Sequence, residues 1–378
     1  MNPKKSFFKI PAIVFSFFFL VSCSSQKYYL FIGTYTDTDS KGIYVYDFNS
    51  KTGEAKWVSN TDSVTNPSYL AISPDQKYVY AVNETNGLNQ GRVTAYSFDK
   101  KDGKLHFLNT TFTGGDDPCY IATSSDNRWL AVANYSSGST AMFPINTDGS
   151  VQPYTQLIHD SIYRNEGGTE AAHVHETVFS PDEKFMLTPD LGLDKVMIYH
   201  FDSSANKPLV ISSPASVESV KGSGPRHIVF HPNKKFAYLM HEMGGTITTY
   251  YYDNGKLSQV QELPAYPEGF AGKKDGAEVC VSPDGKFLYT SCRGDLNSIA
   301  VFSIDQSDGK LTLKGFESSS GSGPRNFIID PSGNFLLAAN QASANVVIFK
   351  RDKETGLLSK TGKEIQVPRP VCLQMIPE

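Results

Sequence analysis

The chain has 378 residues, of which 35 are Lys or Arg and 39 are Asp or Glu, so its formal net charge is −4. A mildly acidic chain lacks the positive charge with which general nucleic-acid binders attract phosphates, and we expect no nucleic-acid partner. With 12% aromatic and 20% charged residues, the composition is that of a folded globular protein.

The first 22 residues have the order of a secretion signal. Lysines at the start precede an apolar run over residues 10–20, which is too short to span a bilayer stably. The run ends in Leu20-Val21-Ser22-Cys23, which resembles a bacterial lipoprotein signal with Cys23 as the lipidated N-terminus. We therefore expect export and a lipid anchor at Cys23 in the cell envelope, followed by a short linker over residues 23–27. An ordinary signal peptide or an N-terminal anchor is the alternative.

Residues 28–378 are predicted to form a single domain built from a repeat. Six turn-forming triplets recur with their middle residues 51, 56, 51, 51 and 48 positions apart. Pro followed by Asp, Asn or Ser is typical of a tight turn. Each triplet follows a short apolar strand and precedes two β-rich runs, and a weaker fourth strand is visible near residues 105–111 and 311–317. The triplets are Ser73-Pro74-Asp75, Ser124-Ser125-Asp126, Ser180-Pro181-Asp182, His231-Pro232-Asn233, Ser282-Pro283-Asp284 and Asp330-Pro331-Ser332.

Four strands in each repeat, without helical periodicity, predict an all-β fold, a β-propeller with one blade per repeat. The two ends of the chain complete a blade between them. Pro370 to Met375 is predicted to be an innermost strand with nothing after it, whereas Tyr28 to Tyr35 and Gly42 to Phe48 are second and third strands with no first strand before them. Pairing these strands closes the ring, removes its exposed edges, and gives seven four-stranded blades rather than six or eight.

The cysteines after Cys23 have no metal-ligand spacing. Cys119, Cys280, Cys292 and Cys372 contain no CxxC pair, and Cys280 and Cys292 lie in unmatched register on either side of one predicted turn. We expect all four to be small buried residues without a disulfide. We also expect no metal and no other cofactor.

The topology predicts where a functional site lies. Each innermost strand starts, and each second strand ends, on one face of the ring around the opening of its central channel, which we call the mouth. Four arginines, four histidines and several carboxylates occupy these positions, although the chain is acidic overall. Because guanidinium groups suit planar carboxylates and phosphates, the mouth is predicted to bind a small anion. The basic residues are Arg226, Arg293, Arg325, Arg369, His173, His175, His227 and His241.

Several stretches at these positions resemble the seven-bladed lactonase family, which includes propeller-type 6-phosphogluconolactonases and fungal carboxymuconate-lactonising enzymes. They cover nearly all of residues 28–378 in order. The matching stretches are Phe31-Ile32-Gly33-Thr34-Tyr35-Thr36, His173-Val174-His175, Pro189-Asp190-Leu191-Gly192, Gly224-Pro225-Arg226-His227, His241-Glu242, Ala277-Glu278-Val279 and Pro324-Arg325-Asn326. The resemblance implies hydrolysis of a sugar-acid lactone, most like 6-phosphogluconolactone, in the pentose phosphate pathway. An exported protein would not readily meet that cytoplasmic compound.

The resemblance also implies the active constellation: a histidine, His175 or His173, with Arg226, Glu242 and Arg293. His173 and His175 are two apart on a predicted strand and so point the same way. The pair could chelate a metal, but no third ligand is evident. The alternatives are a histidine satisfied by packing, an inter-blade salt bridge for Arg226 and a structural ion pair for Glu242.

Further mouth residues are candidates for substrate binding. Arg325 is placed to complete an anion clamp with Arg226 and Arg293, and His227 and Glu278 begin innermost strands that face the same opening. Three short polar residues at the ends of second strands are also candidates for substrate binding, although such residues more often form hydrogen bonds with the turn backbone. They are Asp190, Asn134 and Asn83.

We predict that water attacks the ring carbonyl of a bound lactone. An arginine stabilises the oxyanion, and Glu242 or a histidine moves the proton. There is no Gly-x-Ser-x-Gly nucleophile motif. A surface propeller that binds an anionic sugar or peptide without chemistry, and a muconate-type lactonising cyclase, remain open as alternatives. The expected partners are a small anionic lactone and, through Cys23 alone, the membrane; we expect a monomer.

Overall fold

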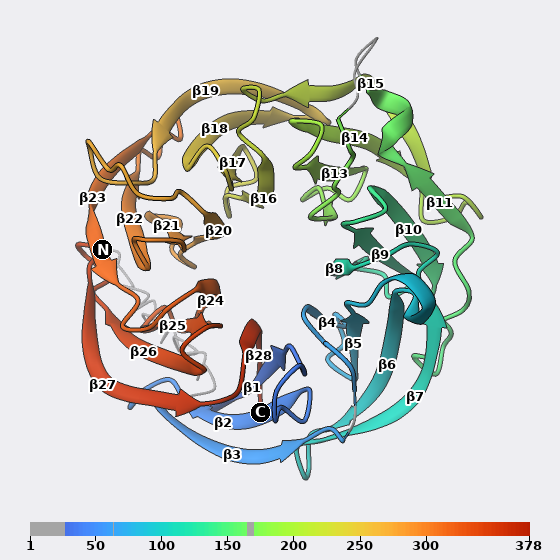
Figure 1. Cartoon of the computed structure of the whole chain (residues 1–378), viewed down its shortest axis with the longest axis horizontal. Helices are drawn as coiled ribbons and strands as arrows, with labels where there is room; N and C mark the ends of the chain where they lie inside the picture. Colours follow the sequence, from blue (N-terminus) through green and yellow to red (C-terminus); the bar gives the residue numbers. More distant parts are fainter. Residues whose placement is uncertain (1–26, 63, 165–169) are drawn as a thin grey trace, which may run out of the picture.

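The computed structural model describes residues 27–62, 64–164 and 170–378. In these ranges 28 strands form seven separate four-stranded antiparallel sheets. Figure 1 shows the sheets arranged radially as blades of a ring, with one strand of each nearest the central axis. The predicted seven-bladed all-β propeller is therefore confirmed. The only helical elements of the described residues are two short 3-10 turns, η1 (Gly87–Asn89) and η2 (Asp160–Tyr163).

Each blade is numbered here from its position in the ring and listed from the innermost strand outward. Blade 1 has β28 (Pro370–Pro377), β1 (Lys27–Thr34), β2 (Tyr44–Asn49) and β3 (Glu54–Asn60). Blade 2 has β4 (Leu70–Ile72), β5 (Tyr78–Asn83), β6 (Arg92–Asp99) and β7 (Lys104–Phe112). Blade 3 has β8 (Pro118–Thr123), β9 (Trp129–Asn134), β10 (Ser139–Pro144) and β11 (Gln156–His159).

Blade 4 has β12 (Val178–Phe179), β13 (Phe185–Asp190), β14 (Lys195–Phe201) and β15 (Leu209–Glu218). Blade 5 has β16 (Pro225–Phe230), β17 (Phe236–His241), β18 (Thr246–Asp253) and β19 (Lys256–Pro264). Blade 6 has β20 (Gly276–Val281), β21 (Phe287–Cys292), β22 (Ser298–Ile304) and β23 (Leu311–Ser318). Blade 7 has β24 (Pro324–Ile329), β25 (Phe335–Asn340), β26 (Asn345–Arg351) and β27 (Leu358–Gln366).

The repeated triplets form the corners between the first and second strands, for a reason visible in their hydrogen bonds. In blade 2 the Ser73 hydroxyl donates to Asp75 Oδ1 at 2.7 Å and accepts from the Tyr78 backbone N–H at 2.9 Å. The serine corners of blades 3, 4 and 6 repeat both bonds. In blade 5, His231 Nδ1 accepts the Asn233 N–H instead. The corner side chain thus ties the turn to the strand that follows it.

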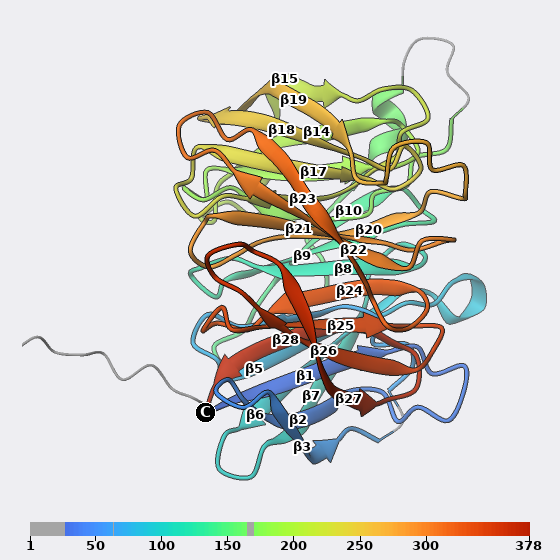
Figure 2. The same ribbon diagram turned by 90° about the vertical axis from the view of Figure 1, so that its left-hand side faces the viewer.

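The termini close the ring as predicted. β1 pairs antiparallel with β28 from Tyr28 opposite Pro377 to Thr34 opposite Pro370, so the last strand of the chain is the innermost strand of blade 1. The inner edge of β1 is therefore paired, whereas an unpaired edge there would be a site of aggregation. In the side view of Figure 2 the blades are seen from the rim of the ring, with loops emerging on its two faces.

Aromatic and branched residues fill the spaces between neighbouring blades. Phe185 and Leu187 of blade 4, for example, share a buried cluster with Leu239 and Tyr250 of blade 5. The fully buried large side chains include Tyr80, Tyr199, Tyr238, Tyr250 and Tyr289. The abundant Tyr and Phe therefore stabilise blade packing through large buried areas, as the composition suggested.

Two further observations concern cysteines and membranes. Cys119, Cys280, Cys292 and Cys372 are free thiols, of which only Cys280 is not fully buried. None of them forms a disulfide among the described residues.

Among the described residues, no helix is long and apolar enough to cross a bilayer. The predicted signal segment and Cys23 lie outside the described residues, so the prediction of an anchor stays a prediction.

Candidate active site

The strand register gathers the predicted mouth residues on one face. In blades 5 and 7, Pro225 lies opposite His241 and Pro324 opposite Asn340, so each innermost strand starts beside the end of its second strand. Blades 1, 3 and 6 share this pairing. In blade 4 the strand start is reduced to a single bridge between Val174 and Asp190. Side chains from different blades therefore meet around one opening.

The centre of the site is an ion pair between blade 5 residues. Arg226 Nε donates to Glu242 Oε2 at 2.7 Å, and Arg226 Nη1 donates to the Ala277 carbonyl at 2.9 Å. Arg226 is 1% exposed, whereas the Glu242 side chain is 24% exposed. Arg226 is thus a buried support, and the glutamate is the member of the pair that faces solvent.

Arg293, at the end of the second strand of blade 6, completes the cluster. Its Nη2 lies 3.0 Å from the same Glu242 oxygen and 2.5 Å from Asp275 Oδ1. Two guanidinium groups and two carboxylates thus form a continuous charged network at the mouth. We call Arg226, Glu242, Asp275 and Arg293 the charged cluster. Because Glu242 Oε2 receives both arginines, the ion pairs leave Oε1 free to contact a ligand.

The charges of the cluster change its pKa values. Burial alone would raise the pKa of Glu242, but Arg226, Arg293 and Arg325 together hold it below its ordinary value. Burial, followed by repulsion from Arg226, lowers the pKa of Arg293 to about 10. At neutral pH the cluster therefore contains an ionised carboxylate between two charged guanidinium groups.

A second, deeper pair supports the first. His227 Nδ1 lies 3.0 Å from Glu278 Oε1, and His227 Nε2 lies 3.4 Å from Arg226 Nη1. Glu278 Oε2 accepts from Asn326 Nδ2 at 2.5 Å. His227 and Glu278 were predicted to bind substrate. The structure buries both and bonds them to each other and to their neighbours, below the charged cluster.

The two histidines of blade 4 have different surroundings. His173 stacks on Tyr135 with ring centroids 4.6 Å apart, and its Nδ1 lies 3.0 Å from the Tyr135 carbonyl. His175 is buried, 5.1 Å from His227 between ring centroids, and its Nδ1 has no hydrogen-bond partner among the described residues. Burial, and then the charge of Arg226, lower the pKa of His175 well below its usual range. Its imidazole is therefore neutral at neutral pH.

Arg325 has a different environment from the arginines of the cluster. Its guanidinium carbon lies 5.6 Å from the centre of the Tyr35 ring. Burial alone would lower its pKa, but Tyr35, Glu84 and Glu242 raise it, so the group stays charged. In the described part of the chain no carboxylate oxygen lies within 4.0 Å of it. This arginine is consequently the mouth guanidinium best able to receive a ligand anion.

Three predicted binding residues serve the framework. Asn83 donates to the Thr65 carbonyl at 2.8 Å and accepts from the Thr94 hydroxyl at 2.7 Å. Asn134 is fully buried and donates to the Ser139 hydroxyl. Asp190 Oδ1 accepts from the backbone N–H groups of residues 173, 192 and 193. The backbone bonds of Asn83 and Asp190 match the alternative expected for short polar residues at strand ends, whereas Asn134 bonds a side chain of the neighbouring strand.

Sequence reasoning missed two acidic groups near the site. Asp275 immediately precedes Gly276, the first residue of the innermost strand of blade 6. This position beside a strand start could have identified Asp275 as a mouth residue from the sequence. Glu176 lies below the mouth, where its Oε2 accepts the Ile228 N–H at 2.6 Å. Burial raises the pKa of Glu176 to about 8. No spacing in the sequence indicated that residue.

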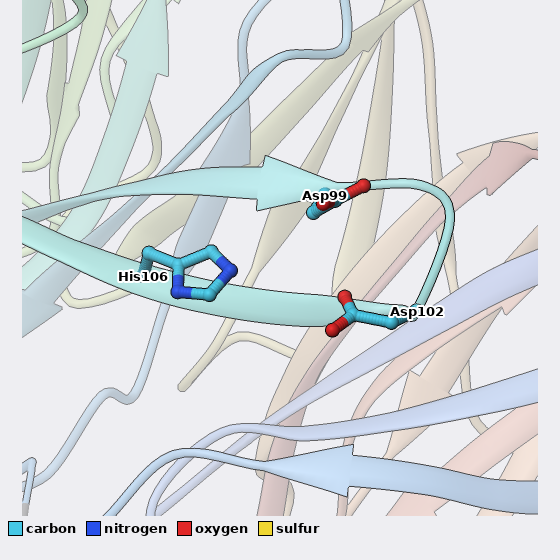
Figure 3. A group of neighbouring side chains, drawn as sticks. All are labelled: Asp99, Asp102 and His106. Carbon is cyan, nitrogen blue, oxygen red and sulfur yellow. The ribbon is translucent and has the colours of Figure 1, made fainter.

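One group of possible metal ligands lies elsewhere. Asp99, Asp102 and His106 are exposed on the hairpin between β6 and β7 (Figure 3), and no other group of three such residues is found in the described ranges. Asp102 pairs with Lys104 at 3.1 Å, and Asp99 Oδ1 accepts the Lys101 N–H at 2.8 Å. Since both carboxylates stabilise the hairpin turn, we assign no metal to them.

The chain matches the family described as "Lactonase, 7-bladed beta-propeller" over residues 29–375. It is 38% identical to a 6-phosphogluconolactonase of Formosa agariphila over 354 residues, which are 92% of this chain and 99% of the relative. It is 35% identical to a 6-phosphogluconolactonase of Bacillus subtilis over 93% of this chain and 99% of the relative. These matches span nearly all of the described residues.

Solved structures of related proteins have the same fold as this chain. A putative 6-phosphogluconolactonase of Bacteroides fragilis superposes with a TM-score of 0.88 and 39% identity, covering 94% of this chain and 99% of the other. A periplasmic gluconolactonase of Pseudomonas aeruginosa gives a TM-score of 0.87 and 37% identity, covering 93% and 99%. The blade arrangement that positions the mouth is therefore shared over more than nine-tenths of the chain.

Proposed function

The chain belongs to the lactonase family of seven-bladed β-propellers, and from this premise we propose that it is a lactone hydrolase of the 6-phosphogluconolactonase type. The reaction opens a sugar-acid lactone with water and gives the open-chain acid. The observation that carries the proposal is the joint contact of Arg226 and Arg293 with one oxygen of Glu242 at the mouth. This arrangement leaves an ionised, partly exposed carboxylate that interacts with the charge of Arg325, an arginine with no carboxylate partner in the described residues.

The first step is attack of water on the carbonyl carbon of the ring. A new C–O bond forms, and negative charge develops on the former carbonyl oxygen. Arg325 stabilises this charge, because its guanidinium has no carboxylate partner in the described residues. In a partly buried site such a preorganised donor contributes far more than it would in water.

The second step transfers protons. Glu242 takes the proton of the attacking water through the oxygen that its arginines leave free, and the tetrahedral intermediate then breaks the ring C–O bond. The proton returns to the leaving alkoxide, which becomes the sugar hydroxyl. His175, a neutral imidazole near the cluster, is the alternative proton acceptor. No covalent intermediate is required.

Arg226 acts through Glu242 in this scheme. Because Arg226 is buried and bonded to the Ala277 carbonyl, it holds the carboxylate in one orientation and in its ionised form. His227 contacts the Arg226 guanidinium and is itself held by Glu278. These residues are positioning residues, whereas Glu242 and Arg325 would contact the reacting atoms.

Lactone hydrolysis by a Glu242→Gln variant tests the proposal. The amide cannot take a proton, so we expect the rate above spontaneous hydrolysis to fall by more than about tenfold. Acid release is followed with 6-phosphogluconolactone and with an unphosphorylated aldonolactone, and ultraviolet absorbance is followed with a muconate. Loss of muconate absorbance would favour the lactonising cyclase, and binding without turnover would favour a surface receptor.

The matched control is Glu262→Gln. This residue lies on the exposed outer strand of the same blade, so the same chemical change is made away from the mouth. Wild-type rates are expected for the control. A wild-type rate in Glu242→Gln, with the circular dichroism spectrum unchanged, would remove Glu242 from the mechanism.

We also propose export and a lipid anchor at Cys23, on the support of the lysines, the short apolar run and the cysteine that ends it. Incorporation of labelled palmitate in the expressing cell tests this: Cys23→Ala is expected to lose the label. Cys119→Ala, which changes a buried thiol, is expected to keep it. Equal labelling of both variants would contradict the anchor.

A further inference from the structure

A cavity of about 520 Å³ lies at the mouth and is lined by none of the four residues of the charged cluster. Its lining residues come from the strand starts and ends of blades 1, 2, 3 and 7, whereas the charged cluster comes from blades 5 and 6. They include Tyr35, Asp37, Glu84, Asp117, Gln341 and Arg369. The volume is in the range of small-molecule sites.

Arg325 connects the two halves of the mouth. Its guanidinium faces the ring of Tyr35, which lines the cavity, and its charge interacts with Glu242 of the cluster. A lactone whose carbonyl oxygen lies at Arg325 can therefore direct the rest of its carbon chain toward Tyr35. The Tyr35 hydroxyl is fixed by a 2.8 Å hydrogen bond to Glu84 Oε1, so this wall of the cavity is rigid.

The cavity carries negative charge. Asp37, Glu84 and Asp117 supply three carboxylates, and the guanidinium that lines it, Arg369, is already paired with Asp37 at 3.1 Å. Asp117 accepts from Ser136 and Asn86, which orient its carboxylate without neutralising it. A dianionic phosphate placed here would be repelled, since like charges across a contact are costly.

The charged cluster provides little further positive charge. Arg226 and Arg293 are compensated by Glu242 and Asp275, with N–O distances between 2.5 and 3.0 Å. Among the four guanidinium groups of the mouth, Arg325 alone has no carboxylate within 4.0 Å in the described ranges. One uncompensated guanidinium matches the single negative charge of a carboxylate product. One guanidinium cannot balance both the carboxylate and the additional negative charges of a phosphate.

We propose that this cavity is the subsite for the hydroxylated chain of the lactone, and that it selects an uncharged chain over a phosphorylated one. The inference rests on the proposed lactone hydrolysis. Carboxylates accept hydrogen bonds from sugar hydroxyls, and the amide of Gln341 can both donate and accept. The same carboxylates disfavour phosphate, which is selection by repulsion.

The test compares kcat/KM for glucono-1,5-lactone and its 6-phosphate, each corrected for spontaneous hydrolysis. We expect the wild type to favour the uncharged lactone by about tenfold or more, because the phosphate lies against carboxylates that outnumber the one guanidinium lining the cavity. Asp117→Asn keeps the shape and removes one charge; its amide oxygen can still accept from Asn86, and its amide nitrogen can donate to the Ser136 hydroxyl. It is expected to shift the preference toward the phosphorylated lactone by roughly fivefold.

Asp116→Asn is the matched control. It makes the same change one residue away, where the side chain lines a different cavity, so the preference is expected to stay within about twofold of wild type. A wild-type preference for the phosphorylated lactone would overturn the inference, and so would an unchanged preference in Asp117→Asn.

Calorimetric binding of the products separates this inference from the proposed function. Gluconate is expected to bind more tightly than 6-phosphogluconate, and Asp117→Asn is expected to narrow the difference. If neither lactone is hydrolysed but gluconate binds more tightly than 6-phosphogluconate, the proposed hydrolysis is wrong and the proposed subsite is supported. If hydrolysis is observed but 6-phosphogluconate binds more tightly, the subsite is wrong and the hydrolase stands.

Discussion

At the scale of single residues, the site depends on ionisable side chains whose neighbours fix their protonation. Glu242 is held ionised by three arginines, and His175 is held neutral by burial and by positive charge. Both shifts favour the form that accepts a proton. The local chemistry therefore supplies a base at neutral pH without a histidine titrating near its usual value.

The first prediction concerns the pH dependence of activity. A base works in its unprotonated form, and a lowered pKa keeps it unprotonated to lower pH. Since the pKa of Glu242 is below its ordinary 4.5, kcat/KM is expected to stay level between pH 7 and pH 5. Initial rates of acid release, corrected for spontaneous hydrolysis, give the profile. A fall centred near 6.5, the ordinary value for histidine, would instead indicate an unperturbed imidazole as the base.

The second prediction concerns stability and Glu176. Its pKa of about 8 in the folded protein, above the ordinary 4.5, means that the folded state keeps a proton that the unfolded chain has lost. Stability should therefore fall as the pH rises from about 4.5 to about 8. Glu176→Gln removes this pH-dependent contribution to the free energy of unfolding. Its melting temperature, relative to wild type, is expected to be a few degrees higher at pH 8 than at pH 5.

The control for that prediction is the exposed Glu268→Gln, for which the difference from wild type should not depend on pH. Parallel melting curves for wild type and Glu176→Gln across this pH range would show that Glu176 is ionised in the folded state.

At the scale of elements, the corners between first and second strands account for the regular repeat. A hydroxyl, imidazole or carboxylate at the first corner position accepts a backbone N–H of the turn or of the next strand. In blade 7 the motif is reversed: Asp330 accepts from Phe335 N–H and from the Ser332 hydroxyl. The same hydrogen bonds can thus be made by Ser-Pro-Asp or by Asp-Pro-Ser.

This equivalence gives the third prediction. Ser73→Ala leaves the Tyr78 N–H and Asp75 without their partner and is expected to lower the free energy of unfolding by about 1–3 kcal/mol. The double change Ser73→Asp with Asp75→Ser recreates the corner of blade 7 and should recover most of that loss. Chemical denaturation measures both. Equal losses in the two variants would contradict the proposed role of the corner.

At the scale of the whole molecule, the site exists because the ring is closed. The arginines that contact Glu242 belong to blades 5 and 6, Arg325 belongs to blade 7, and Tyr35 belongs to the blade built from both termini. Asn326 of blade 7 also accepts the Leu373 N–H of β28 at 2.9 Å. Loss of closure would therefore disturb the positions of residues far apart in the sequence.

The fourth prediction tests closure. A chain that ends at Arg369 lacks β28, so blade 1 loses its innermost strand and β1 gains an exposed edge. We expect loss of a cooperative thermal transition and recovery mainly as aggregate. A chain that ends at Ile376 keeps the pairing of β1 from Tyr29 onward and should melt close to wild type. Native-like melting of the shorter chain would show that the ring does not need this strand.

The sequence by itself determined the blade count, the corners and the pairing of the terminal strands. These features are repetitive and local, so hydrophobic patterning and turn chemistry specify them without long-range information. It also placed Arg226, Glu242 and Arg293 on one face, because strand direction follows from the order of the repeats.

Only the tertiary structure decided how deep each of these side chains lies and which partner it has. Arg226, His227 and Glu278 all begin innermost strands, yet they are buried and bonded to one another, whereas Arg325 has no carboxylate partner in the described residues. Contacts between neighbouring blades set these differences. Because ion pairing and burial depend on contacts across blades, the sequence pattern could not distinguish the supporting arginine from the one that is available to a ligand.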